Sequence, residues 1–221
     1  MAPDAEAQSP AMGATSKGPS IQPRTTHDRA LSLCVYCGSR TGDHAAFRAT
    51  AGAIGQAIGH RGWRLVYGGG RAGLMGCVAD AALAAGAEVV GVIPKALMGL
   101  ELGHGGLTEL HVVDTMHERK RLMAERSDAF VALPGGIGTF EELFEVWTWL
   151  QLGYHDKPVG LLNAAGYYDL LLAFLDQSVK RGFVPAAQRE LLQVLTDPDA
   201  LLDRIETLAR PQSVAEDYRQ I

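Results

Sequence analysis

Cysteine is scarce in this sequence of 221 residues, and no hydrophobic run is long enough to cross a membrane. The three cysteines, Cys34, Cys37 and Cys77, are too few for a disulfide framework. Cys34 and Cys37 form a C-x-x-C pair inside one apolar stretch, and a strand there would turn residues three apart to opposite faces. We therefore expect neither a shared metal nor a redox disulfide at this pair. Because no run of about 18 apolar residues exists, we expect no transmembrane helix and no membrane partner.

The chain also lacks an excess of positive charge. Its net charge is −5 at pH 7, which is not the basic footprint of a DNA- or RNA-binding protein. Residues 1–28 lack both apolar periodicity and the hydrophobic stretch of a signal peptide, so we expect a disordered tail. Residues 29–221 are long enough for one domain with a full core, and we expect a cytoplasmic protein.

Apolar runs alternate with helical patterns from residue 31 onward. We expect strands at residues 31–37, 63–67, 87–93, 110–113, 129–133, 158–162 and 192–195. We expect helices near residues 43–59, 73–85, 115–126, 139–152, 166–181 and 198–209. Several strands are apolar throughout, which is typical of a parallel sheet covered on both faces. The pattern predicts an α/β fold with a single doubly wound, mostly parallel, Rossmann-like sheet and helices on both faces, and ligands bind such sheets beyond the carboxyl ends of the strands.

Glycine is plentiful, with 26 residues, and it gathers in three turns that follow predicted strands. The first turn contains Gly38 and Ser39, the second contains Gly69 and Gly70, and the third is P-G-G-I-G-T at residues 134–139. Each turn would bring backbone N–H groups and a helix N-terminus to one edge of the sheet, which favours phosphate binding. One such turn is what any short strand-to-helix connection requires, but three at one edge favour a ligand.

The second turn matches the dinucleotide fingerprint G-x-G-x-x-G through Gly68, Gly70 and Gly73. In dinucleotide-binding folds this fingerprint follows the first strand, and an acidic residue ends the next strand. Here the turn follows the second predicted strand, and the acid in the corresponding region, Glu88, opens the next strand. We therefore do not expect NAD binding.

The third turn leads into a predicted helix, where Glu142 allows two interpretations. Thr139 is a good N-cap, and a glutamate three residues later completes a capping box. In that interpretation Glu142 only satisfies the first backbone amides of the helix. An acid beside a phosphate-binding loop is also well placed to contact a bound sugar.

Arg119 and Lys120 have no acidic neighbour three or four residues away on the predicted helix 115–126. Charged runs usually form solvated faces, in which pairs such as Arg121 and Glu125 balance the charge. A cationic pair that shares its face with methionines also suits a phosphate or carboxylate supplied from elsewhere. Both interpretations are open at this point.

Two motifs occur together in this chain: M-H-E-R-K at residues 116–120 and P-G-G-I-G-T-F-E-E at residues 134–142. They match the paired motifs M-H-x-R-K and P-G-G-x-G-T-x-x-E. The chain thereby resembles the LONELY GUY (LOG) family, cytokinin riboside 5′-monophosphate phosphoribohydrolases that are often mislabelled as lysine decarboxylases. The resemblance extends from residue 31 to residue 195.

The resemblance implies hydrolysis of the N-glycosidic bond of cytokinin nucleoside 5′-monophosphates to the free base and ribose 5-phosphate, with AMP as a candidate for a poorer substrate. It implies that Arg119 and Glu142 are the catalytic pair, that no metal or organic cofactor is needed, and that the protein is a homodimer. The residues implied to bind the substrate are Glu101, Met116, Arg119, Lys120, Gly135, Gly136, Ile137, Gly138, Thr139, Phe140, Glu141, Glu142 and Thr148.

The implied chemistry agrees with these residue types. Cleavage of the N-glycosidic bond builds positive charge on the ribose ring, and a carboxylate such as Glu142 can stabilise that charge or orient the attacking water. Arg119 would position Glu142 and the ribose, while the glycine loop would anchor the phosphate.

Two other functions fit parts of the sequence. A non-catalytic nucleotide or cofactor carrier, similar to molybdenum-cofactor carrier proteins, would bind phosphate at the same loop without releasing a base. A lysine decarboxylase would need pyridoxal phosphate on a lysine, and no lysine stands in a recognisable context for it. The residues do not fix the preferred base: Met116, Trp147 and Trp149 could contact it, although such aromatic residues mostly pack in the core.

Overall fold

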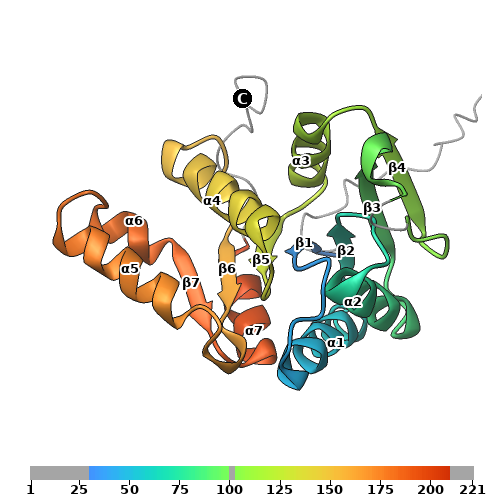
Figure 1. The fold of residues 1–221 in the computed structure, drawn as a ribbon, viewed down its shortest axis with the longest axis horizontal. Coiled ribbons are helices and arrows are strands. Elements are labelled where there is room, and N and C mark those ends of the chain that lie inside the picture. The colour runs from blue at the N-terminus through green and yellow to red at the C-terminus, as the bar shows by residue number, and fades with distance from the viewer. Residues whose placement is uncertain (1–29, 100–102, 210–221) are drawn as a thin grey trace, which may run out of the picture.

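The computed structural model describes residues 30–99 and 103–209, so the tail predicted at residues 1–28 lies outside it. Seven strands form one sheet in the order β4-β3-β2-β1-β5-β6-β7, and all its strand pairs are parallel (Figure 1). The strands are β1 (Ser32–Tyr36), β2 (Arg64–Tyr67), β3 (Val89–Pro94), β4 (Glu109–Val113), β5 (Ala129–Ala132), β6 (Val159–Leu162) and β7 (Leu192–Leu195). Every strand agrees with its predicted range to within about two residues, the usual uncertainty of element boundaries.

Helices cover both faces of the sheet (Figure 1). One face carries α1 (Ala45–His60), α2 (Gly73–Ala84) and α7 (Pro198–Leu208), and the other carries α3 (Met116–Glu125), α4 (Ile137–Leu152) and α5 (Asp169–Lys180). The short elements are η1 (Lys95–Leu97), η2 (Ala164–Gly166) and α6 (Ala186–Glu190). Among the residues described, no helix combines the length and the hydropathy of a transmembrane segment. The doubly wound α/β fold predicted from the sequence is confirmed.

The central strand β1 contributes side chains to two separate cores. Leu33 and Val35 pack with α1, α2 and α7, whereas Cys34 and Tyr36 pack with α3 and α4. All five residues of β1 are buried because helices cover both faces of the sheet. Cys37 belongs to the first core and Cys34 to the second, so the two thiols face opposite sides as predicted.

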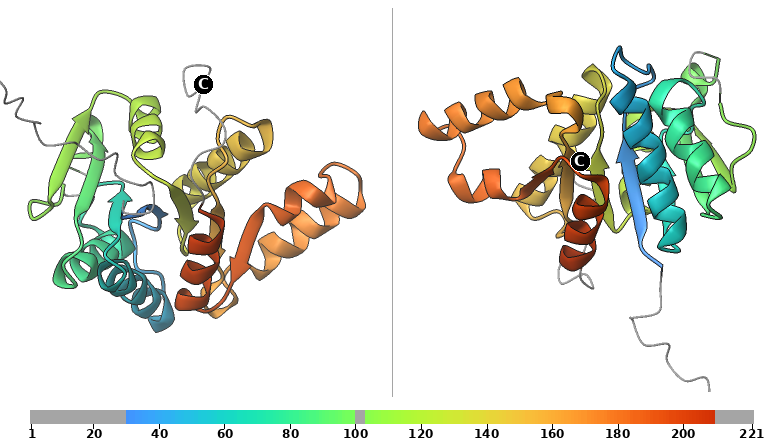
Figure 2. Two further views of the ribbon diagram at one scale, coloured as in Figure 1. Left: turned by 180° about the vertical axis from the view of Figure 1, so that it is seen from behind. Right: turned by 90° about the horizontal axis from the view of Figure 1, so that it is seen from below.

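Two glycines let α1 and α2 pack closely side by side (Figure 2). A Cβ atom at Gly55 would lie 2.4 Å from the carbonyl oxygen of Val78, and one at Gly59 would lie 2.4 Å from the Cβ of Ala85. The tight contact fixes α2, whose first residue, Gly73, lies in the second glycine turn.

The strand order places a topological switch between β1 and β5. The chain runs outward from β1 to β4 and then returns to β5 on the other side of β1, and ligands bind such sheets at this point. The loops after these two strands meet there, because Gly38 N donates to Pro134 O over 3.1 Å. Leu74 N, which follows the second glycine turn at the start of α2, donates to Gly38 O over 2.9 Å. The three glycine turns therefore lie together at one edge of the sheet, as predicted.

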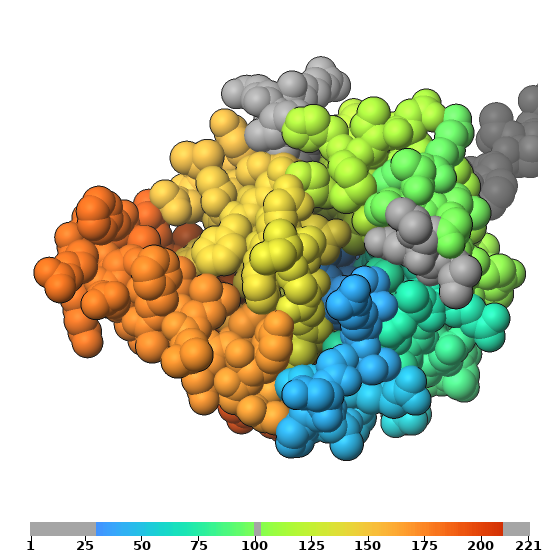
Figure 3. All heavy atoms as spheres, viewed as in Figure 1, coloured from blue at the N-terminus to red at the C-terminus, as the bar shows by residue number. Residues whose placement is uncertain are grey.

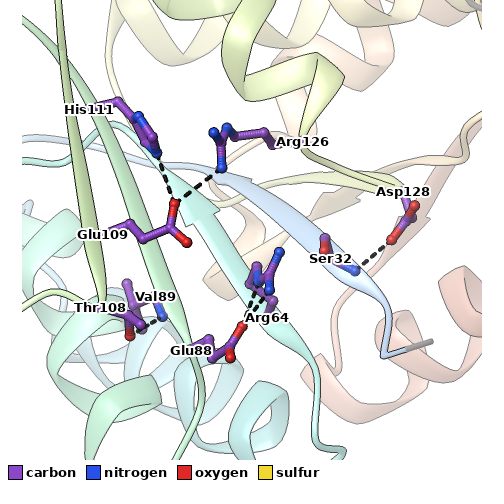
Figure 4. Close-up of polar contacts among 9 residues, drawn as sticks. All are labelled: Ser32, Arg64, Glu88, Val89, Thr108, Glu109, His111, Arg126 and Asp128. Carbon is purple, nitrogen blue, oxygen red and sulfur yellow. Dashed lines mark hydrogen bonds and ion pairs between the residues drawn. The ribbon is translucent and has the colours of Figure 1, made fainter.

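Glu88 lies at the opposite edge of the sheet, where the strands begin. It precedes β3 and forms an ion pair with Arg64 at the start of β2 (Figure 4). At the same edge, the backbone N–H of Ser32 donates to Asp128 over 2.8 Å (Figure 4). Glu88 is thus placed away from the glycine turns, and it cannot act as the ribose-binding acid of a dinucleotide site.

Candidate active site

A cavity of about 320 Å³ opens at the carboxyl ends of β1 and β2, between α3 and α4. The space-filling view shows a hollow where the segment after β1 (blue), α3 (lime green) and the start of α4 (yellow) meet (Figure 3). This position is the switch point of the sheet, so the fold places the cavity where all three glycine turns converge.

The structure brings most of the predicted site residues to this cavity. Those that line it are Gly38, Ser39, Met116, Arg119, Gly136, Ile137, Gly138, Thr139, Glu141 and Glu142. Gly135 instead borders a neighbouring cavity of about 430 Å³. The predicted residues that line neither cavity are Lys120, Phe140, Thr148, Gly69 and Gly70. Glu101 lies outside the described residues.

The loop after β5 uses its carbonyl oxygens within the protein and leaves amides available. Pro134 O accepts from Gly38 N, and Gly136 O accepts from Phe140 N in α4. Within the described ranges, no protein group accepts a hydrogen bond from the amides of Gly136, Ile137 and Gly138. These three residues line the cavity at the positive end of the α4 dipole. Their amides form a cradle for a phosphate or another anion.

Helix α4 begins two residues before its predicted start, and this changes the role of Glu142. Its N-cap is Gly136, which has an extended backbone and no capping side chain. The predicted capping box is therefore wrong, because Thr139 is buried in the first turn and Glu142 stands in the second turn. Only the first-turn amides lack a helical acceptor, so Glu142 does not cap them. Glu142 lines the cavity instead.

Arg119 is buried, with only 4% of its surface exposed, although arginine stays charged in proteins. Its Nε donates to Val92 O over 3.1 Å, and its Nη2 donates to Gly68 O over 2.9 Å. The interpretation of this residue as part of a solvated face is therefore wrong. The two backbone acceptors hold the guanidinium at the wall of the cavity, which thus contains a fixed positive charge.

Lys120 is buried as well, and carboxylates from another helix are its partners. Its Nζ donates to Glu145 over 2.9 Å and also contacts Glu141. Burial lowers the pKa of Lys120, but the hydrogen bonds to the two carboxylates outweigh this effect and raise it. Burial raises the pKa of Glu145 in spite of the lysine. These contacts tie α3 to α4, the two helices that flank the cavity.

Helix α3, which carries Arg119, is anchored at both ends. At its start, Thr115 Oγ1 accepts from Glu118 N over 3.1 Å. Just after its end, Arg126 pairs with Glu109 of β4 over 3.2 Å (Figure 4). The capped start resists fraying, and the ion pair ties the end of the helix to β4. Helix α3 thus holds Arg119 in place beside the cavity.

Part of the cavity lining consists of residues that the two sequence motifs do not include. Val35 and Tyr36 end β1, while Met75, Leu97 and Met123 come from α2, η1 and α3. Burial raises the pKa of Tyr36 well above its usual value, so its hydroxyl stays protonated. Flexible methionine and leucine side chains can adapt to the flat face of a base. The sequence signal that could have identified Val35 and Tyr36 is their place at the end of a central strand.

Trp147 and Trp149 belong to the core. Each has 7% of its surface exposed, and neither lines the cavity. The indole N–H of Trp147 donates to Gln188 O over 3.1 Å. Of the three residues considered as contacts for the base, Met116 alone lines the cavity.

The cavity combines a carboxylate, a buried guanidinium and an anion cradle. A phosphate in the cradle would place the group attached to it beside Arg119 and Glu142. A carboxylate in that position can stabilise positive charge that develops on a sugar ring. Among the residues described, no three His, Cys, Asp or Glu side chains gather closely enough to hold a metal ion.

Comparison with known proteins gives one family. A sequence model of the family described as "Possible lysine decarboxylase" matches residues 75–205, more than half of the chain. The chain is 51% identical over 178 residues to a protein of Oryza sativa subsp. japonica named "Probable cytokinin riboside 5′-monophosphate phosphoribohydrolase", and the match covers 80% of each chain. It is 46% identical over 193 residues to a cytokinin riboside 5′-monophosphate phosphoribohydrolase of Arabidopsis thaliana, with 87% of this chain and 88% of the relative covered.

Solved structures of lower identity share the fold. The molybdenum cofactor binding protein of Rippkaea orientalis has a TM-score of 0.64 and 21% identity, over 83% of this chain and 99% of that one. The molybdenum cofactor carrier protein of Chlamydomonas reinhardtii has a TM-score of 0.61 and 23% identity, over 81% of this chain and 98% of that one. At these identities the likeness shows the fold alone.

Proposed function

The chain belongs to the LONELY GUY (LOG) family of cytokinin riboside 5′-monophosphate phosphoribohydrolases, and we propose that the cavity between α3 and α4 is its active site. It is a hydrolase that cleaves the N-glycosidic bond of cytokinin nucleoside 5′-monophosphates to the free base and ribose 5-phosphate. One observation carries the assignment of the site: Arg119, Glu142 and the cradle of amides at residues 136–138 line a single cavity.

The 5′-phosphate binds the amide cradle at the start of α4 in this proposal. Gly136, Ile137 and Gly138 offer donors with no acceptor in the described part of the protein, and the helix dipole adds a favourable potential for a dianion. Phosphate binding fixes the ribose in the cavity and orients the N-glycosidic bond for attack.

Glu142 and Arg119 act on the sugar. As the bond to the base breaks, positive charge grows on the ribose ring. The Glu142 carboxylate stabilises this charge and orients the attacking water. Arg119 is held by Gly68 O and Val92 O. It positions the ribose relative to the Glu142 carboxylate.

The apolar side chains of Met75, Leu97 and Met123 in the cavity lining support placement of the base against them. Such a surface accommodates a purine and an apolar substituent without requiring either. We therefore propose that AMP is cleaved as well, at a lower rate than cytokinin nucleotides.

The enzyme is favoured over a carrier because the curated relatives of high identity are named phosphoribohydrolases. The molybdenum-cofactor proteins share the fold at 21% and 23% identity, and fold alone does not carry function. The decarboxylase description of the family finds no support in the names of these relatives.

A base-release assay tests this function. The purified protein is incubated with isopentenyladenosine 5′-monophosphate, with AMP and with isopentenyladenosine, and free base is measured by chromatography. We expect rapid release from the cytokinin nucleotide, slower release from AMP, and almost none from the nucleoside that lacks a phosphate. Binding of the nucleotides without any base release would instead favour a carrier.

We also propose that the protein is a homodimer and works in the cytoplasm. The dimer is supported by two large exposed apolar side chains, Leu170 and Phe174. They stand four residues apart on one face of α5, and exposed apolar groups mark association surfaces when they cluster. Light scattering after size-exclusion chromatography measures the mass, and a monomer at micromolar concentration would contradict the dimer.

A further inference from the structure

Two adjacent tyrosines after β6 donate hydrogen bonds to the backbone of the glycine loop. The Tyr167 hydroxyl lies 2.5 Å from Gly135 O, and the Tyr168 hydroxyl lies 2.7 Å from Leu133 O. Tyr167 is 41% exposed, whereas Tyr168 is buried. They follow their acceptors by 32 and 35 residues, and neither belongs to the two sequence motifs.

The segment that carries these tyrosines is held by its own contacts. Asn163 Oδ1 accepts from Tyr168 N over 2.8 Å, and Asn163 Nδ2 donates to Asp169 over 2.7 Å. Ala165 has a left-handed backbone with φ of 51°, a conformation that persists only where the surroundings enforce it. The two tyrosine rings meet edge to face, with centroids 4.8 Å apart. The hydroxyls therefore reach the glycine loop from a fixed support.

The hydrogen bond from Tyr167 acts on the peptide group between Gly135 and Gly136. In a trans peptide the C=O and N–H groups point in opposite directions, and the described residues contain no cis peptide. Since the Gly135 carbonyl points toward Tyr167, the Gly136 amide points away from it. Tyr167 lines the neighbouring cavity of about 430 Å³, whereas Gly136 borders both cavities. The Gly136 amide is thereby directed toward the active-site cavity.

A peptide group between two glycines rotates easily, because neither residue has a Cβ atom to restrict its backbone. Rotation would turn the Gly135 carbonyl oxygen toward the cradle, where it would repel a phosphate. The Tyr167 hydroxyl opposes this rotation by binding that oxygen. Tyr168 cannot act in this way, because the next residue after its acceptor Leu133 is Pro134, which has no N–H.

We propose that Tyr167 is a positioning residue for the 5′-phosphate: its hydroxyl fixes the Gly135–Gly136 peptide so that the Gly136 amide donates to the phosphate. This inference rests on the proposed function, which places the phosphate at the loop after β5. Tyr167 does not line the active-site cavity, so its loss acts on phosphate affinity and leaves the affinity for an unphosphorylated nucleoside unchanged.

The test compares Tyr167→Phe with Tyr168→Phe as the matched control, since each variant loses one hydroxyl bound to the same loop. Calorimetry measures the dissociation constants of ribose 5-phosphate and of adenosine, and thermal unfolding gives Tm. We expect Tyr167→Phe to bind ribose 5-phosphate roughly tenfold more weakly, with unchanged adenosine binding and Tm. Tyr168→Phe loses a buried hydrogen bond, so its Tm falls while its affinity for ribose 5-phosphate stays within about twofold of wild type.

Wild-type affinity of Tyr167→Phe for ribose 5-phosphate would overturn the proposal. Equal losses of affinity in both variants would also overturn it, because they would indicate a general loosening of the loop. Ribose 5-phosphate is not turned over, so this measurement is independent of catalysis. If the wild-type protein binds it but releases no base from any nucleotide, the proposed reaction fails while the role of Tyr167 is still decided by the binding data.

Discussion

The guanidinium of Arg119 lies directly against the backbone of Gly68. Its Nη2 donates to Gly68 O over 2.9 Å, and a Cβ atom on Gly68 would lie 2.1 Å from that same nitrogen. The second glycine turn therefore makes room for the Arg119 side chain at the wall of the cavity. This explains the glycine at residue 68 without a dinucleotide ligand.

Gly68→Ala is expected to displace Arg119 and to reduce catalysis. A small shift of a catalytic group is costly, so we expect kcat/KM for base release to fall by roughly 100-fold. Gly52→Ala on α1 is the matched control, because a Cβ there meets nothing within 4 Å. The control should keep full activity and gain about 0.5–1 kcal/mol of unfolding free energy. Normal turnover by Gly68→Ala would contradict the role given to this contact.

Lys120→Met removes the cation that joins α3 to α4. The variant leaves Glu141 and Glu145 without their lysine partner. We expect the unfolding free energy to fall by about 1–2 kcal/mol. The loss is no larger because Glu141 is partly exposed and solvent screens its contact with the lysine. The double variant with Glu145→Gln should regain part of that loss. Urea unfolding measures both changes. A large rise in KM at unchanged stability would instead indicate direct contact with the substrate.

His155 makes stability depend on pH. It is buried, its Nδ1 accepts from Lys157 N, and burial lowers its pKa to about 4. The unfolded chain takes up the proton near pH 6.5, before the folded protein does, so stability is lost as pH falls. From about pH 7 to about pH 5 this residue should cost about 2 kcal/mol of unfolding free energy. Urea unfolding of His155→Gln should show a smaller loss of unfolding free energy between these two pH values than the wild type shows. If the unfolding free energy of the variant depends on pH as that of the wild type does, the assignment to His155 is refuted.

The sequence predicts the fold because its strands are apolar runs, and because its helices are amphipathic or begin and end at turn residues. Central strands such as β1 and β5 are buried on both faces, and this leaves an unbroken apolar run in the sequence. The sequence pattern places the start of α4 two residues too late, because Gly136 is an N-cap without a side chain and Gly138 is a poor helix former. The sequence does not predict the short helix α6, because a helix of five residues shows little hydrophobic periodicity.

The sequence predicts those residues of the candidate site that stand together in a continuous motif. The glycine loop and the motif with Arg119 are continuous in the sequence, whereas Tyr36, Met75 and Leu97 reach the cavity from separate elements. Thr148 was implied by the family resemblance, yet it is exposed on α4 and does not line the cavity. Its role as a substrate contact stays a prediction.

The most direct test of the active site is the base-release rate of Glu142→Gln together with its affinity for AMP. We predict a fall in kcat of roughly 1,000-fold at an AMP dissociation constant within about threefold of wild type, because the glutamine keeps the shape of the side chain but cannot stabilise the charged ribose. Glu125→Gln, which alters an exposed glutamate paired with Arg121 on α3, is the control and should turn over normally. Turnover by Glu142→Gln at the wild-type rate would contradict the account.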